Sequence, residues 1–197
     1  IRTPGVVIGS LLYVGLPALL IFRQPDLGTA LVLVAIWFGM TFLAGARVRH
    51  LALVALFGML AFIAMWHFDA LHDYQKKRVI AFVNPDLDPR EAGYHVIQAR
   101  IAVGSGQVSG KGIGRGTQVQ GRFIPENHTD FIFTVIGEEG GFVAGVAVIA
   151  LYGVVLLRGC LIAGYAEDLL GKLLAGGVAS MLAFHVILNI GMNLGVM

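Results

Sequence analysis

The sequence has few charged residues and a single cysteine. Asp, Glu, Lys and Arg make up only 13% of its 197 residues, whereas about a quarter is usual in a soluble domain. This shortage of charge excludes an ordinary water-soluble domain. The one cysteine, Cys160, excludes a disulfide within the chain. A net charge of +2, with both signs interspersed in the polar segments, gives no reason to expect a nucleic-acid partner.

Apolar residues are abundant instead, at 57% of the chain, and the mean hydropathy is +0.80. They are gathered in five long blocks, at 6–22, 27–46, 51–66, 140–157 and 173–197. Crossing the hydrocarbon core of a bilayer takes roughly 17–25 helical residues, which is about the length of each block. The sequence therefore predicts an all-α polytopic membrane protein with five transmembrane helices.

The basic residues between these blocks indicate the orientation of the chain. One side of the membrane receives Arg2, Arg47, Arg49, Arg158 and Lys172, and the other short connection receives only Arg23. Lys and Arg are enriched in cytoplasmic connections, so the first group is predicted to lie in the cytoplasm. We therefore expect three transmembrane helices in 1–66, a large extracytoplasmic loop in 67–130, and two further helices of the same membrane domain in 131–197.

Two parts of the predicted loop, 72–83 and 93–103, have the pattern of short amphipathic helices. In the second, Tyr94, Ile97 and Ile101 fall near one face. The chain begins with Ile1, ends within an apolar block and shows no signal peptide. We therefore expect residues of the full protein to be missing at both ends.

A glycine-rich run, GSGQVSGKGIGRGTQ, occupies 104–118. It is not a P-loop, because Ser105 and Gly112 stand where that motif requires Gly and Ser or Thr. Two interpretations remain, a flexible connector and a loop that contacts phosphate. The surrounding charges favour phosphate, since no acid lies between Glu91 and Glu126 while several basic residues do. A solvated run of charges is the ordinary alternative.

Three carboxylates accompany the fourth apolar block. Asp130 directly precedes FIFTVIG, where it could cap a helix or act as a general base at the mouth of an apolar cavity; the two roles are compatible. Glu138 and Glu139 follow about 12 Å further along the helix, too far to share a proton or a metal with Asp130. A carboxylate inside a membrane normally faces a cavity or a cation, which we expect here. The EEGG stretch at 138–141 could also mark a break in the helix.

Further polar residues lie in the last block, where His185, Asn189 and Asn193 recur every four residues and form one stripe. Hydrogen bonding between helices is the simpler explanation, and the lining of an aqueous cavity is the alternative. Elsewhere, the spacing of His67, Asp69, His72 and Asp73 matches no standard set of metal ligands, so the identity of any metal stays open.

Several stretches together resemble the SEDS family of shape, elongation, division and sporulation proteins. They are QPDLGT (24–29), HDYQKKRV (72–79), GYHVIQARIAVGSG (93–106), GKGIGRGTQ (110–118), PENHTDFIF (125–133) and GEEGG (137–141). HDYQ and GKG…GTQ resemble the elongation branch of the family more than its division branch. The resemblance implies a fold of about ten transmembrane helices, of which this chain has five. The early helices and the late PLP…SYGG signature of the family are absent.

The resemblance also implies an activity, a location and partners. Family members are peptidoglycan glycosyltransferases that polymerise lipid II into a lipid-linked glycan at the outer face of the bacterial cytoplasmic membrane. They work with a class B penicillin-binding protein and other membrane proteins of the elongation complex. The family's essential acid lies in HTDFIF, which here is Asp130.

An inverting single displacement needs one base and cations for the leaving pyrophosphate. We expect Asp130 to be the base, and the pyrophosphate contacts to be Lys111, Arg115, Arg122, Gln118 and Lys77 or Arg78. A divalent cation, Mg²⁺ or Mn²⁺, could meet the leaving-group charge instead. The competing functions are a flippase or transporter for a lipid-linked precursor and a noncatalytic scaffold for a penicillin-binding protein.

Overall fold

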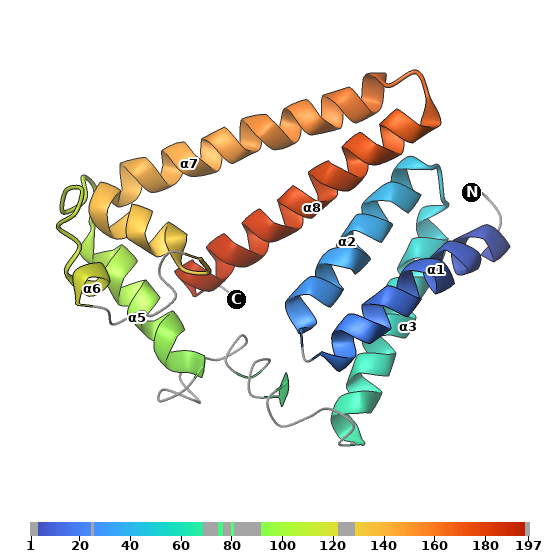
Figure 1. Ribbon diagram of the computed structural model, residues 1–197, viewed down its shortest axis with the longest axis horizontal. Coiled ribbons are helices and arrows are strands. Elements are labelled where there is room, and N and C mark those ends of the chain that lie inside the picture. Colours follow the sequence, from blue (N-terminus) through green and yellow to red (C-terminus); the bar gives the residue numbers. More distant parts are fainter. Residues whose placement is uncertain are drawn as a thin grey trace. The chain divides into compact units, whose positions relative to one another are not determined.

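The computed structural model describes residues 4–24, 26–68, 75–76, 80, 92–121 and 129–195, with the main chain alone at 27, 92 and 119. The elements in these ranges are all helices, so the predicted all-α class is confirmed (Figure 1). In chain order they are α1 (Pro4–Arg23), α2 (Leu27–Leu43), α3 (Val48–His67), α5 (Ala92–Ser105), α6 (Thr117–Gln120), α7 (Ile132–Tyr165) and α8 (Leu169–Leu194).

Four helices, α1, α3, α7 and α8, are long and apolar enough to cross a membrane. The remaining apolar block, at 27–46, forms α2. Its 17 residues reach the lower end of the spanning range of roughly 17–25. Most apolar side chains on these helices are exposed, and only 6% of the apolar window is buried in α1, α3 and α7. Such helices suit a lipid environment, where apolar side chains need no protein cover.

The chain divides into two compact units, and α7 and α8 each contribute to both. The first unit contains residues 1–75 and 155–185, and the second contains 76–154 and 186–197. The first unit therefore holds α1, α2, α3 and the connection between α7 and α8. The second holds Asp130, Glu138 and Glu139 together with the predicted pyrophosphate contacts.

The first unit is built around Trp37 of α2, which is buried against Val7 of α1 and Leu51 of α3. Its indole N–H donates to Ser10 Oγ at 3.1 Å, which satisfies the polar edge of the ring inside an apolar cluster. At the start of α2, Asp26 is the N-cap, and its carboxylate accepts from the N–H of Thr29 at 3.1 Å. A local cap of this kind satisfies an amide that the helix leaves open.

Glycines bring α2 close to α8 within the same unit. A Cβ at Gly39 would collide with Ser180, and one at Gly176 would collide with Leu43. Small residues at helix contacts are typical of membrane proteins, since close packing rather than apolar burial drives association in lipid. This contact therefore depends on glycine at both positions.

The second unit contains α5, which confirms the short helix predicted at 93–103. The residues of α5 that are most buried against protein are Val96, Ala99 and Ala102, whereas Ile101, on the apolar face noted in the sequence, is exposed. The two alanines pack against Phe131, just before α7. The small alanine side chains leave room for the ring of Phe131. Packing against Phe131 therefore decides which face of α5 is buried.

The other predicted amphipathic helix, at 72–83, lies mostly outside the described residues. Its described members are Gln75, Lys76 and Ile80, and all three are helical. Gln75 is almost fully buried.

Candidate functional site

Helix α7 is broken by a kink at Gly141, where φ is 68° and ψ is −167°. This position directly follows Glu138, Glu139 and Gly140, so the break predicted from EEGG is confirmed. Glycine tolerates the positive φ that other residues adopt only under strain. The kink separates a short helical segment, 132–140, from the long remainder of α7.

The kink opens two amides of α7 for contact with the glycine-rich loop. In an unbroken helix, the N–H groups of Phe142 and Val143 would donate to carbonyls four residues earlier. Here Phe142 N donates to Gln107 O at 2.8 Å, and Val143 N donates to Val108 O at 3.2 Å. The loop thus replaces the helical acceptors that the kink removes.

The carbonyls released by the kink are satisfied by the same loop. Lys111 N donates to Glu138 O at 3.0 Å, and Gly112 N donates to Glu139 O at 3.0 Å. Four hydrogen bonds between segments therefore stand in for the two helical bonds that are lost. A buried, unpaired main-chain group would cost free energy comparable to a lost hydrogen bond, which explains why the kink and the docked loop occur together.

Close approach of the loop requires glycine. Gly110 has φ 75°, and a Cβ there would collide with the carbonyl of Glu139. A Cβ at Gly106 would likewise collide with the carbonyl of Gly137. The run is therefore docked onto α7, so the interpretation as a flexible connector is wrong for its described residues. The N–H groups of Gly110, Lys111 and Gly112 already have main-chain acceptors, so phosphate contact would fall to side chains.

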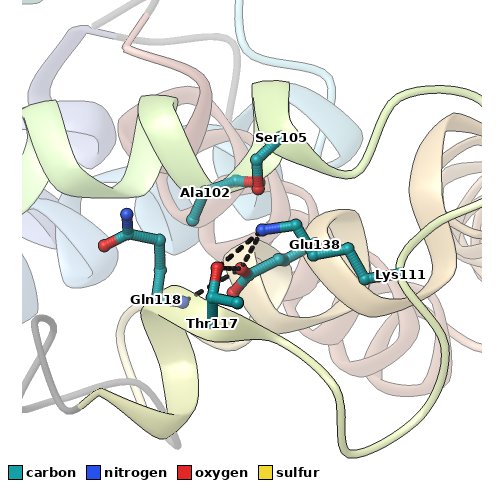
Figure 2. A network of polar contacts seen from close by, with 6 residues as sticks. All are labelled: Ala102, Ser105, Lys111, Thr117, Gln118 and Glu138. Atoms are coloured by element: carbon teal, nitrogen blue, oxygen red, sulfur yellow. Dashed lines mark hydrogen bonds and ion pairs between the residues drawn. The ribbon is translucent and has the colours of Figure 1, made fainter.

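Glu138 is fully buried at the centre of this contact, with 0% of its side chain exposed. Its Oε1 accepts from Lys111 Nζ at 2.8 Å, from Thr117 Oγ1 at 3.2 Å and from Gln118 N at 3.0 Å. Figure 2 shows Lys111 and Glu138 pointing toward one another, with Thr117 beside both. Lys111 Nζ also donates to Thr117 Oγ1 at 2.8 Å. Glu138 thus has the cation and the hydrogen bonds that a buried carboxylate needs.

Thr117 is a residue that the sequence reasoning did not single out, although it belongs to the GKGIGRGTQ stretch quoted for the resemblance. Its hydroxyl accepts from Lys111 and donates to Glu138, so it extends the ion pair into a network. Only the fold brings these residues together, because Lys111 and Glu138 are 27 positions apart in the chain.

The remaining predicted contacts for pyrophosphate differ in their surroundings. Arg115 is exposed, and no hydrogen bond or ion pair of its guanidinium occurs among the described residues. Gln118 has a buried Oε1 that accepts no hydrogen bond from any residue the structure describes. Lys77, Arg78 and Arg122 lie outside the described residues.

Asp130 lies just before α7, with its side chain exposed. Across the described part of the chain, no hydrogen bond or ion pair involves its carboxylate. The predicted capping role is wrong, because the amide of Thr134 in the first turn is satisfied by Phe131 O at 3.1 Å and Asn193 Oδ1 at 3.0 Å. Asn193 of α8, a residue distant in the chain, thus caps this amide in place of a neighbouring residue. The carboxylate of Asp130 is left exposed.

Helix α8 holds the main chain of Asp130. Asn189 Nδ2 donates to Asp130 O at 2.9 Å, and Asn193 Nδ2 donates to the same oxygen at 2.8 Å. Two members of the polar stripe therefore make hydrogen bonds between helices, the simpler of the two explanations for that stripe. The third member, His185, is exposed and lies in the first unit. Glu139 is half-buried, and none of the described hydrogen bonds involves its side chain.

No three His, Cys, Asp or Glu side chains are brought together in the described ranges in a way that could hold a metal ion. Asp69, His72 and Asp73 lie outside these ranges. The described residues therefore do not supply a donor set for the divalent cation that the sequence left open.

Long apolar helices, few charges and a polar cluster at one kinked helix define a polytopic helical membrane protein. The chain belongs to the FtsW, RodA and SpoVE family, described as cell cycle proteins, whose family pattern matches residues 3–197. The predicted family resemblance is thereby confirmed.

The chain is similar to several curated proteins, two of which, reported first, carry an enzyme name. The chain is 43% identical over 188 residues to peptidoglycan glycosyltransferase MrdB of Escherichia coli (strain K12), covering 95% of this chain and 50% of that protein. It is 48% identical over 127 residues to peptidoglycan glycosyltransferase RodA of Treponema pallidum (strain Nichols), covering 64% and 29%. It is 40% identical over 177 residues to stage V sporulation protein E of Bacillus subtilis (strain 168), covering 90% and 47%. The chain thus spans about half the length of the first of these relatives.

Proposed function

We propose that this chain is part of a RodA-type peptidoglycan glycosyltransferase that polymerises lipid II into glycan strands during cell elongation. The names of its relatives support the reaction class. The observation that carries the proposal is Asp130, whose carboxylate is exposed and unbonded within the described part of the chain while its main chain is held by α8. A fixed carboxylate with open lone pairs suits a general base.

The stereochemistry of the reaction explains why one carboxylate is enough. An α-linked pyrophosphate donor that gives a β-linked product inverts the anomeric carbon in a single displacement. The acceptor 4-hydroxyl attacks the anomeric carbon, its proton passes to Asp130, and the bond to pyrophosphate breaks. A carboxylate nucleophile would give retention through a covalent intermediate, so Asp130 acts as a base in this proposal.

The leaving pyrophosphate requires positive charge. Arg115 is the most available of the described candidates, because it is exposed and its guanidinium can bind phosphate in a bidentate fork. Lys111 is 27% exposed, but its charge is already matched by Glu138. Gln118 would add a polar contact, and Lys77, Arg78 and Arg122 stay predictions. A Mg²⁺ or Mn²⁺ ion remains an alternative for this charge, and no step of the mechanism is assigned to it.

The proposal includes a location and partners. The protein would be a multi-pass protein of the bacterial cytoplasmic membrane, with the site facing outside. It would take lipid II and the growing lipid-linked glycan as substrates. A class B penicillin-binding protein would crosslink the product, in company with other membrane proteins of the elongation complex.

The decisive experiment supplies purified lipid II to the full-length protein with its partner in detergent. We expect the wild type to form glycan strands, and Asp130→Asn to lose activity by at least about 10²-fold, because general-base catalysis is typically worth 10²–10⁴-fold. Strand length and yield on gels are the measurement. An unchanged melting temperature shows that the variant is folded. Strand formation at the wild-type rate by Asp130→Asn would overturn the assignment of the base.

The same experiment separates the competing functions. A flippase would move labelled lipid II across liposome bilayers without forming strands, and a scaffold would bind the partner without either activity. Three of the polar groups inside the apolar helices, Glu138, Asn189 and Asn193, have structural partners in the described chain. Glu138 pairs with Lys111, and Asn189 and Asn193 hold Asp130. They therefore give no independent support to a transport path.

A further inference from the structure

We infer that Asn193, assisted by Asn189, is a positioning residue that holds the main chain from which the Asp130 carboxylate projects, an inference that rests on the proposed role of Asp130 as the base. Asn193 is fully buried near the end of α8. Asp130 is 63 positions away in the chain and joined to it by one direct hydrogen bond.

The carbonyl side of Asn193 is fixed by Thr134. Its Oδ1 accepts from Thr134 N at 3.0 Å and from Thr134 Oγ1 at 2.5 Å. A main-chain N–H can only donate, so the carbonyl oxygen of Asn193 must face Thr134. Both residues are 0% exposed, so water cannot replace these bonds if they are lost.

The amide side of Asn193 consequently faces Asp130. Its Nδ2 donates to Asp130 O at 2.8 Å and to Asn189 O at 2.7 Å. Asn189 Nδ2 donates to the same Asp130 oxygen at 2.9 Å. Both hydrogens and both acceptor sites of the Asn193 amide are therefore in use. One side chain of α8 thus joins the first turn of α7 and the main chain of Asp130, two residues before that helix.

This arrangement holds Asp130 without occupying its carboxylate. All the described bonds to Asp130 go to its main-chain oxygen, and the acid itself stays exposed. The next residue, Phe131, is buried against Ala99 and Ala102, with Met192 packed beside it. The main chain is thus anchored at the carbonyl of Asp130 and at the residue that follows it. A base held this way keeps its lone pairs for the substrate proton, and a displacement of about 1 Å can cost 10²-fold in rate.

The test separates positioning from general stability. Asn193→Asp keeps the acceptor for Thr134 but replaces the donor to Asp130 with an oxygen that repels the carbonyl. Thr134→Val removes one hydroxyl bond and leaves the contacts of Asp130 intact. We expect Asn193→Asp to lower kcat for lipid II polymerisation by about 10²-fold with little change in KM. Thr134→Val should lower the melting temperature and leave kcat near the wild-type value.

A milder variant guards against misfolding of Asn193→Asp. Asn189→Leu is close in volume, sits at a half-buried position and removes only one of the two bonds to Asp130. We expect a loss in kcat of about tenfold. Its matched control is Ile187→Ala, an exposed position on the same helix, which should leave kcat unchanged. Wild-type kcat in both folded asparagine variants would overturn the inference.

A second readout does not depend on activity. A nitroxide spin label is attached to Asp130→Cys in a full-length background that lacks other cysteines, including Cys160. We expect the mobile component of the spectrum to grow with Asn189→Leu and Asn193→Asp, but not with Ile187→Ala. An unchanged spectrum in both asparagine variants contradicts the anchoring. If the label becomes mobile while Asp130→Asn retains full activity, the anchoring stands and the proposed base is wrong.

Discussion

Glu138 and Glu139 are neighbours of the same residue type, yet the fold treats them differently. Adjacent residues on a helix point about 100° apart, so the two carboxylates have different surroundings. Glu138 is fully buried and paired with Lys111, while Glu139 is half-buried and interacts with the loop through its main-chain oxygen. The ion pair therefore belongs to one glutamate, and its role is to hold the loop on the kinked helix.

Removing the cation of this pair should destabilise the protein. Lys111→Met leaves the Glu138 carboxylate buried without its cation, which we expect to lower the free energy of unfolding by about 3 kcal/mol. Thermal unfolding in detergent measures the loss. Lys111→Met combined with Glu138→Gln should recover part of it, because the uncompensated charge is gone. A single variant as stable as the double variant would contradict a structural pair and return Lys111 to a purely pyrophosphate-binding role.

At the scale of elements, the kink in α7 and the docked glycine-rich loop depend on each other. The kink exposes two amides and two carbonyls of α7, and the loop satisfies all four. The short segment 132–140, which follows Asp130, is therefore held from both ends. The asparagines of α8 anchor its start, and the loop anchors its end.

Gly110→Ala should undock the loop. Its φ of 75° disfavours any side chain, and the added Cβ would collide with Glu139 O. We expect a loss of at least about 2 kcal/mol in the free energy of unfolding, since the backbone penalty and the collision add. Thermal unfolding and limited proteolysis between 106 and 116 measure the effect.

Gly104→Ala is the matched control for this substitution. Gly104 lies in the last turn of α5, where a Cβ would meet nothing within 4 Å. Alanine favours a helix over glycine by up to about 1 kcal/mol, so this variant should be as stable as the wild type or slightly more so. Equal protease sensitivity of the two variants would show that the docking does not depend on Gly110.

At the scale of the whole molecule, the distribution of Lys and Arg predicts the orientation in the membrane. The glycine-rich loop is predicted to lie outside and the connection between α7 and α8 in the cytoplasm. Ile113 at the tip of the loop is 95% exposed, and Glu167 in the connection is exposed. Ile113 and Glu167 are therefore suitable positions for chemical labelling from the two sides of the membrane.

Cysteine labelling in cells tests this orientation. In a background without other cysteines, we expect a membrane-impermeant maleimide to label Ile113→Cys from outside. Glu167→Cys should react only after the membrane is opened. The opposite pattern would invert the topology and place Asp130 away from an outer-face substrate.

Features that depend only on local sequence could be predicted, because their physical causes lie within the segment itself. Apolar blocks of spanning length predict helices, because backbone groups in lipid must be satisfied within the segment. The glycines after Glu138 predicted the break in α7. Contacts between distant segments could not be predicted. The residues of α5 that pack against Phe131 were not predicted, and neither was the hydrogen bond from Thr134 in the first turn of α7 to Asn193.

The sequence by itself determined the membrane class, the family and the acid at the head of α7, since hydropathy, length and motif order are properties of the chain alone. The tertiary structure decided how that acid is held and what its neighbours do. Lys111 meets Glu138 across 27 positions, and Asn193 meets Asp130 across 63. Whether a buried polar side chain binds a substrate or another part of the chain depends on which partners the fold places within hydrogen-bonding distance.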